Sequence, residues 1–264
     1  MIMKKKPSKA LYVAFISLGL VFLASCNFNG LNTEPQSTSS DNQTATAAPK
    51  MIVDGNTLSY GDHVYTVNGE INFKAKNHKT PSASVTFTNN PSNYMEFETV
   101  YYNLLGKTPQ GAAAMIPMAI ELYARDASVG KQCFELLCNG SATSDGIIRI
   151  LKTKLVPSQY ANANDSYIQR YMAAALLKGA DNKNSYTPQE PYTVEMCSSP
   201  NGEKDAPLMG GTVYYLYILA HGWDSHQRAV DILLPYNSEY YKIANCSSTY
   251  TQCKNIIGTW PGIK

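Results

Sequence analysis

The stretch that decides the fold is QGAAAMIPMAIELYARD, residues 110–126. It carries apolar side chains on nearly every side of a helical projection, which is typical of a helix surrounded by protein. Thr108 and Pro109 precede it and supply an N-cap hydroxyl and a proline suited to the first helical turn. Pro117 removes one backbone hydrogen bond within the helix and should bend it. We therefore expect this segment to form the central helix of the core.

Helical patterns also lie on both sides of this segment. Asn-Gly at residues 139–140 is a typical signal for the end of a helix, and Gly179 is another. With the central helix, the patterns predict about five helices in total. The other four are expected over residues 93–105, 129–138, 144–155 and 166–178.

Strand patterns flank the helical region. Residues 64–67 and 70–73 alternate around Asn68-Gly69, a pair that favours a two-residue hairpin turn. After the helices, residues 211–220 (GTVYYLYILA) are rich in Tyr, Val and Ile and predict a central strand. A polar turn is expected at 198–208. Further strands are expected over residues 84–88, 192–197, 227–234, 240–244 and 256–257.

These patterns together predict an α+β fold. We expect a helical core of about five helices, packed on a small antiparallel sheet or meander formed by the N- and C-terminal strands. No internal repeat is present in the sequence. The prediction is one globular domain over residues 51–264.

The first 26 residues have the pattern of an export signal. Four lysines within residues 4–9 precede an apolar run of thirteen residues, 11–23, which is too short to span a bilayer comfortably. The ending Leu-Ala-Ser-Cys resembles the lipobox of bacterial lipoproteins, in which the cysteine thiol receives a diacylglycerol and the chain is cut before it. The resemblance implies that Cys26 is acylated, with palmitate among the chains. An ordinary signal peptide with an incidental cysteine is the alternative.

Residues 27–50 predict a flexible tether. They are rich in Ser, Thr, Asn and Gln and nearly free of large apolar side chains, so they cannot bury enough surface to offset the entropy of ordering. The predicted organisation is a signal peptide (1–25), a lipidated cysteine with its tether (26–50) and the folded domain. Two or more acyl chains anchor a protein stably. We expect an exported protein that is lipid-anchored to a bacterial membrane. Asn27 favours the outer membrane or cell surface by analogy with enterobacterial lipoproteins.

Composition argues against nucleic acid as a partner. The formal net charge of +2 includes four lysines of the signal segment and no acid there, so the mature chain stands near +2 − 4 = −2. No run of five or more Lys and Arg residues occurs. A basic footprint for nucleic acid is therefore missing from the sequence.

Five cysteines follow Cys26. Export to an oxidising compartment permits disulfides, and Cys246 and Cys253 flank a short polar loop that a disulfide could close. Cys133 and Cys138 lie on a predicted helix, where a bond between them would require the helix to end first. The odd number leaves at least one thiol unpaired or joined to another protein.

One polar cluster has residue types that suit chemistry. His221, Asp224 and His226 combine imidazole and carboxylate groups, which are common metal ligands, and His226 could act as a base near neutral pH. The Gly and Ser between them favour a surface turn instead. The sequence contains no nucleophile elbow, phosphate-binding loop or dinucleotide fingerprint. No cofactor is therefore expected.

A second candidate site is aromatic. Tyr186, Tyr192 and Trp223 lie in or beside two predicted loops, 181–191 and 221–227, which could meet on one side of the sheet. Their rings could form a recognition patch. The alternative is that these rings pack against the helical half of the domain.

Two blocks of the sequence resemble an uncharacterised bacterial domain family of unknown function. They are residues 171–194 (YMAAALLKGADNKNSYTPQEPYTV) and 211–230 (GTVYYLYILAHGWDSHQRAV). The resemblance covers residues 92–245. It implies a helical half followed by a small β-meander, and it brings no assigned activity. The elements that carry it are Leu177-Lys178-Gly179-Ala180, Ser185-Tyr186-Thr187-Pro188 and the segment around Gly222, Asp224 and Ser225.

The sequence therefore predicts a membrane-anchored lipoprotein of the cell envelope. Its expected role is a non-enzymatic binding or structural module for a protein, a peptide or a glycan. The alternative is an envelope hydrolase or metal-dependent enzyme that uses His221, Asp224 and His226. The sequence leaves open whether the protein catalyses any reaction, although the missing catalytic motifs favour binding.

Overall fold

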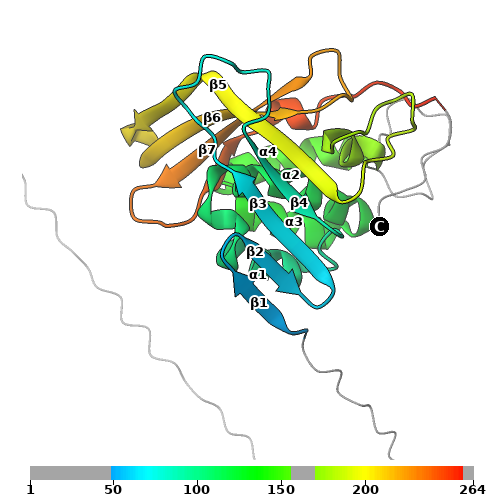
Figure 1. Cartoon of the computed structure of the whole chain (residues 1–264), viewed down its shortest axis with the longest axis horizontal. Coiled ribbons are helices and arrows are strands. Elements are labelled where there is room, and N and C mark those ends of the chain that lie inside the picture. Colours follow the sequence, from blue (N-terminus) through cyan, green and yellow to red (C-terminus); the bar gives the residue numbers. More distant parts are fainter. Residues whose placement is uncertain (1–48, 156–169, 258–264) are drawn as a thin grey trace, which may run out of the picture. The chain divides into compact units, whose positions relative to one another are not determined.

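The computed structural model describes residues 49–155 and 170–257. Within them, eight strands form one antiparallel sheet whose spatial order follows the chain (Figure 1). The sheet is therefore a meander, interrupted after the fourth strand by the helices. The strands are β1 (Met51–Asp54), β2 (Thr57–Tyr60), β3 (His63–Gly69), β4 (Ala83–Phe87), β5 (Tyr192–Ala206), β6 (Gly211–Leu219), β7 (Gln227–Pro235) and β8 (Lys242–Asn245).

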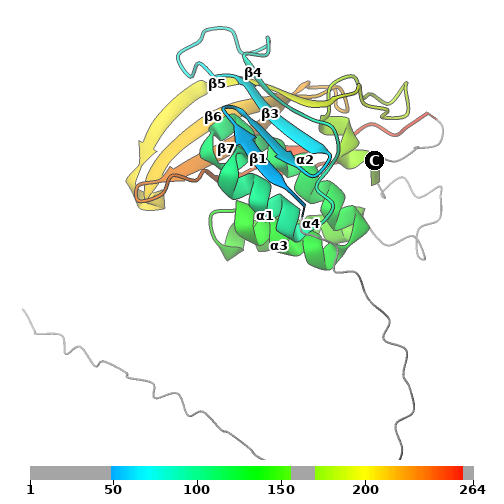
Figure 2. The same ribbon diagram turned by 60° about the horizontal axis from the view of Figure 1, so that its bottom comes forward.

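In the described ranges, four α-helices pack together on one face of this sheet, which gives the folded unit two layers (Figure 2). Two short 3₁₀ turns, η3 (Arg170–Met172) and η4 (Ala174–Leu176), lead from the helices back to β5. No helix in the described ranges is both long enough and apolar enough to cross a membrane. The helices are α1 (Tyr94–Asn103), α2 (Pro109–Arg125), α3 (Ala127–Leu137) and α4 (Ser141–Lys154).

The predicted fold class is wrong in its proportions. The described residues contain four α-helices and a large eight-stranded antiparallel sheet, not five helices on a small sheet. Where it is described, the expected helix over 166–178 consists of the two 3₁₀ turns. The expected turn at 198–208 is mostly the second half of β5. A shift of register between Ser198 and Glu203 absorbs the turn-forming residues there, and β5 pairs with β6 on both sides of it.

The predicted hairpin at Asn68-Gly69 is also wrong. β3 ends at Gly69 and pairs with β2 on one side and β4 on the other. The two-residue turns lie earlier, at residues 55–56 and 61–62, where Gly55 and Gly61 adopt φ values of +56° and +62°. The alternation in residues 64–67 therefore indicates a strand that pairs with β2 on one side and β4 on the other. The Asn68-Gly69 pair lies at the end of that strand.

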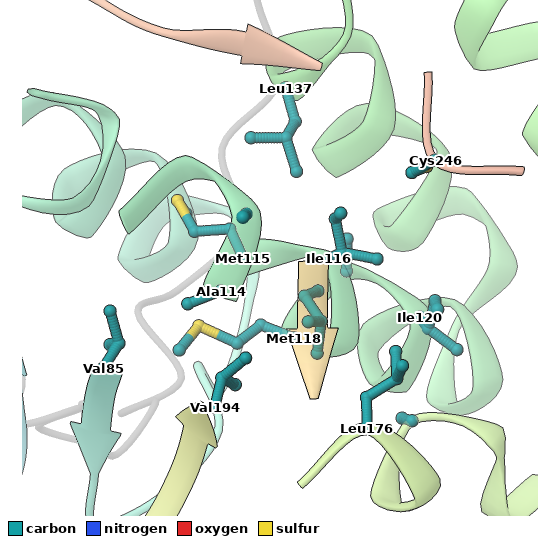
Figure 3. Close-up of a cluster of buried hydrophobic side chains, with 14 of the residues drawn as sticks. Val85, Ala114, Met115, Ile116, Met118, Ile120, Leu137, Leu176, Val194 and Cys246 are labelled. Carbon is teal, nitrogen blue, oxygen red and sulfur yellow. The ribbon is translucent and has the colours of Figure 1, made fainter. Parts of the chain in front are cut away.

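The prediction for the central helix is confirmed. Every residue of α2 from Gln110 to Tyr123 is buried, and Thr108 caps the helix by accepting a hydrogen bond from Gly111 N over 3.0 Å. Figure 3 shows α2 side chains, among them Met118, in a cluster with Val85 of β4, Val194 of β5, Leu137 of α3 and Leu176 of η4. The helix thus joins the sheet to the remaining helices.

Candidate functional site

The structure brings together two of the three residues in the predicted polar cluster. The ring centroids of His221 and His226 lie 4.4 Å apart. The Asp224 side chain is 98% exposed and forms an ion pair with Lys254 over 3.0 Å. No group of three or more His, Cys, Asp or Glu side chains in the described part of the chain is placed to hold a metal ion. The two imidazoles are therefore neighbours, and Asp224 does not join them.

The three aromatic residues of the predicted patch are buried. Tyr186, Tyr192 and Trp223 are at most 6% exposed. The hydroxyl of Tyr186 donates to Lys254 O over 2.7 Å, and the indole N–H of Trp223 donates to Thr251 O over 3.3 Å. Buried Tyr and Trp rings commonly satisfy their polar ends in this way. Tyr186 and Trp223 thus bond to the C-terminal segment, whereas the ring of Tyr192 packs against Phe87 of β4. The three rings form no exposed recognition surface.

The described cysteines form no disulfide. The predicted bond between Cys246 and Cys253 is not made, because the two thiols face different neighbours. Cys246 lies beside Cys138, whereas Cys253 interacts with the hydroxyl of Tyr186. Burial raises the pKa of both Cys246 and Cys253 to about 12, which keeps them as unreactive thiols at neutral pH. Cys26, the predicted lipid attachment, lies outside the described residues.

A buried carboxylate, not singled out by the sequence, joins β3 to α1. Glu96 is 1% exposed. Its Oε1 accepts hydrogen bonds from Tyr65 Oη over 2.7 Å and from His63 Nδ1 over 2.6 Å, and its Oε2 accepts from Ser92 N over 2.7 Å. Asn93, three residues earlier, caps the same helix by accepting from Glu96 N. This arrangement is close to a capping box, and the Asn-x-x-Glu spacing is the sequence signal that would have found it.

The described residues line a cleft of about 580 Å³. It opens between the β1–β2 turn, the end of β3 and the segment that joins α1 to α2. Its volume falls within the range of small-molecule sites. Val53, Val67 and Leu104 give it an apolar part. Its polar side chains are Asn56, Glu70, Asn103, Lys107, Thr108 and Gln110.

The protein itself fixes the three carboxamides of this cleft. In each, the amide nitrogen donates to a main-chain carbonyl, so the side-chain oxygen is left to act as an acceptor. Gln110 is only 4% exposed, and no described residue donates to its Oε1. The three bonds are Asn56 Nδ2 to Val67 O (2.6 Å), Asn103 Nδ2 to Thr99 O (2.8 Å) and Gln110 Nε2 to Gly69 O (3.1 Å).

Two charged groups complete the lining. Glu70 adds a carboxylate and Lys107 an ammonium group, and neither forms an ion pair with a described residue. The hydroxyl of Thr108 is engaged as the N-cap of α2. The cleft therefore offers several acceptors and one cation, but no paired nucleophile and base.

A family model described as "Domain of unknown function (DUF6935)" matches residues 89–257. The chain belongs to the DUF6935 family. This agrees with the resemblance of two sequence blocks to an uncharacterised domain family. Comparison with curated proteins and with solved structures gives no match.

The DUF6935 match begins after β4, so some residues that line the cleft belong to the matched region and others precede it in the chain. Residues 103–110 come from within the matched region. Residues 53–70 come from the strands that precede it. Neither segment forms the cleft alone, which explains why local sequence patterns gave no sign of it.

A second buried carboxylate makes stability depend on pH. Glu121 of α2 is 5% exposed, and its Oε1 lies 3.5 Å from Nε of Arg125. Burial raises the pKa of Glu121 to about 7, and the nearby guanidinium only partly opposes that rise. The folded protein therefore holds this proton more tightly than the unfolded chain does.

We expect Glu121 to lower stability as pH rises. Its protonated form stabilises the fold fully below its ordinary pKa of 4.5, and that contribution is lost as pH increases through about 7. Glu121→Gln should remove a pH-dependent difference on the order of 2–3 kcal/mol. Denaturant unfolding of both proteins at pH 4, 6 and 8 measures this. Parallel profiles for the two proteins would contradict it.

Proposed function

We propose that this protein is an exported, lipid-anchored component of a bacterial cell envelope that binds a small, donor-rich ligand in the cleft. The lysines, the apolar run and the Leu-Ala-Ser-Cys ending of residues 1–26 support export and acylation at Cys26. The cleft at the start of α2 supports ligand binding. The role is recognition, because the cleft lacks the paired groups that a hydrolase requires.

Gln110 is the observation that carries this proposal. Its side chain is buried in the wall of the cleft, and its carbonyl oxygen accepts no hydrogen bond from the described residues. A buried polar atom without a partner costs about 1–3 kcal/mol. A ligand hydroxyl or N–H that donates to this oxygen would recover that energy. Asn56, Asn103 and Glu70 extend the same acceptor surface.

The ligand class that fits best is a short glycan. Sugar hydroxyls can donate to several amide and carboxylate oxygens at once, and the apolar face of a sugar ring suits contact with Val53, Val67 and Leu104. The ammonium group of Lys107 can pair with an acidic substituent. An envelope location supplies ligands of this kind. A peptide offers fewer donors per unit of volume, so it ranks second.

The test is titration calorimetry of the purified full chain with two panels of probes. One panel contains N-acetylglucosamine oligomers and muropeptide fragments, and the other contains short synthetic peptides. Binding by a glycan, weakened at least tenfold in Gln110→Met, is the expected result. Gln132→Met on the exposed side of α3 is the matched control and should bind normally.

Two results would overturn the proposal. If a glycan binds equally well to the wild type and to Gln110→Met, the cleft is not the site. If only peptides bind, the ligand class is wrong. Circular dichroism and thermal unfolding of Gln110→Met establish that the variant is folded before its affinity is compared.

A further inference from the structure

The two edges of the sheet differ in how they are protected. The outer side of β8 is covered by the end of α3, where Asn139 N donates to Ile243 O over 2.8 Å and Cys138 forms an isolated bridge with Ile243. Within residues 49–155 and 170–257, no strand pairs with the outer side of β1, which forms the lower edge of the sheet in Figure 1. The outward main-chain groups of β1 therefore have no strand partner among the described residues.

β1 also exposes apolar side chains. Met51, Ile52 and Val53 are 43%, 49% and 46% exposed, which makes them the longest consecutive run among the exposed large apolar residues. Sheet edges are usually protected by proline, by inward-pointing charges or by bulges. Pro49, Lys50 and Asp54 stand at the two ends of β1, but Met51, Ile52 and Val53 between them carry no charge or proline, and the pairing with β2 is regular throughout. An open edge of this kind is suited to pairing with another strand.

We propose that β1 pairs antiparallel with β1 of a second copy of the chain, in a symmetric register centred on Ile52. The hydrogen-bond pattern supports this register. Lys50 O accepts from Gly61 N over 3.1 Å, so even-numbered residues direct their main-chain groups towards β2. Met51 and Val53 therefore direct theirs outwards. In the proposed register Met51 faces Val53 of the second copy, and the two such pairs exchange four hydrogen bonds.

The charges of Lys50 and Asp54 favour this register over the registers shifted by one residue. With Ile52 opposite itself, Lys50 lies opposite Asp54 of the second copy, and the symmetry repeats this pair. Both residues are exposed, and neither forms an ion pair with a described residue. A register centred on Met51 sets Val53 opposite Pro49, which has no N–H to donate, and Lys50 opposite Ile52. A register centred on Val53 places Ile52 opposite Asp54. The sequence KMIVD is thus complementary to itself in one register.

Sedimentation of the full chain in detergent, over roughly 1–200 μM protein, tests the dimer. Asp54→Lys and Lys50→Asp each create two like-charge pairs and should weaken association about tenfold or more. The double variant Lys50→Asp/Asp54→Lys exchanges the charges and should restore it. The proposal would be overturned if the wild type stayed monomeric at every concentration. It would also be overturned if the wild type dimerised and neither Asp54→Lys nor Lys50→Asp changed the dimerisation affinity.

Cross-linking tests the register directly. Residues directly opposite in an antiparallel pair have Cβ atoms about 4.5–5.5 Å apart, close enough for a disulfide after small adjustments. Ile52→Cys should therefore give a covalent dimer when oxidised glutathione accepts the two electrons. Asp54→Cys lies on the same face but about 13 Å from its symmetry mate, and it should stay monomeric on a non-reducing gel. Equal cross-linking of both variants, or of neither, would contradict the register.

Discussion

Glu96→Ala should destabilise the folded protein by about 3–5 kcal/mol. The carboxylate of Glu96 is buried and accepts hydrogen bonds from Tyr65, His63 and Ser92. Truncation leaves three donors without their acceptor and opens a cavity between β3 and α1. Burial, with the adjacent carboxylate, also raises the pKa of Tyr65 strongly, so that hydroxyl keeps its proton and is left needing an acceptor. Guanidinium denaturation followed by circular dichroism measures the loss.

A second glutamate on a helix provides the control. Glu135 of α3 is 49% exposed and pairs with Lys131 over 3.6 Å on the surface. Exposed pairs of this type contribute little, so Glu135→Ala should change stability by no more than about 0.5 kcal/mol. Similar losses for Glu96→Ala and Glu135→Ala would show that the buried network does not hold β3 to α1.

This network also connects two parts of the chain that the family match separates. Tyr65 and His63 precede the DUF6935 region, whereas Glu96 lies within it. The cleft has the same construction, since Gly69 of β3 accepts from Gln110 of α2. The first strands are thus bonded to the matched domain at both ends of β3. A change at Glu96 should therefore also weaken the proposed ligand binding in the cleft.

Much of the helical layer could be predicted, because the signals for it are local. Thr108 and Pro109 mark the start of α2, and the run of apolar residues that follows reports burial on all sides. The sheet could not be predicted to the same degree, because its pairing is not local. Val85 of β4 pairs with Val194 of β5, although the segment that contains α1 to α4 separates them in the sequence. No local sequence pattern indicates that the two strands are neighbours.

Local turn signals also gave a wrong prediction where pairing between strands determined the structure. Pro200 and Gly202 are typical turn residues, yet the long strand β5 passes through them because β6 pairs with it on both sides. The position of the aromatic candidate residues could not be predicted from the sequence for a related reason. A tyrosine such as Tyr186 has an apolar ring and a polar tip, and both a binding surface and a core position can satisfy it. Only the fold shows that its hydroxyl bonds to Lys254 O inside the protein.

Met118→Ala should cost about 2–5 kcal/mol of folding free energy. Met118 is fully buried at the centre of α2, in the cluster that also contains Val85 and Val194 (Figure 3). Truncation removes apolar contacts between the helical layer and the sheet and leaves a cavity that the surrounding strands cannot close. Met118→Leu keeps nearly the same volume and should cost less than about 1.5 kcal/mol. Denaturant midpoints of the three proteins measure both effects.

Met95 makes the comparison specific to burial. It lies on α1 and is 67% exposed, so Met95→Ala removes the same atoms from a helix without opening a cavity. We expect a change within about 0.5 kcal/mol of the wild type. Because both substitutions alter helix propensity in the same direction, the difference between them isolates the packing of α2 against the sheet. Equal losses at positions 95 and 118 would mean that α2 does not hold the two layers together.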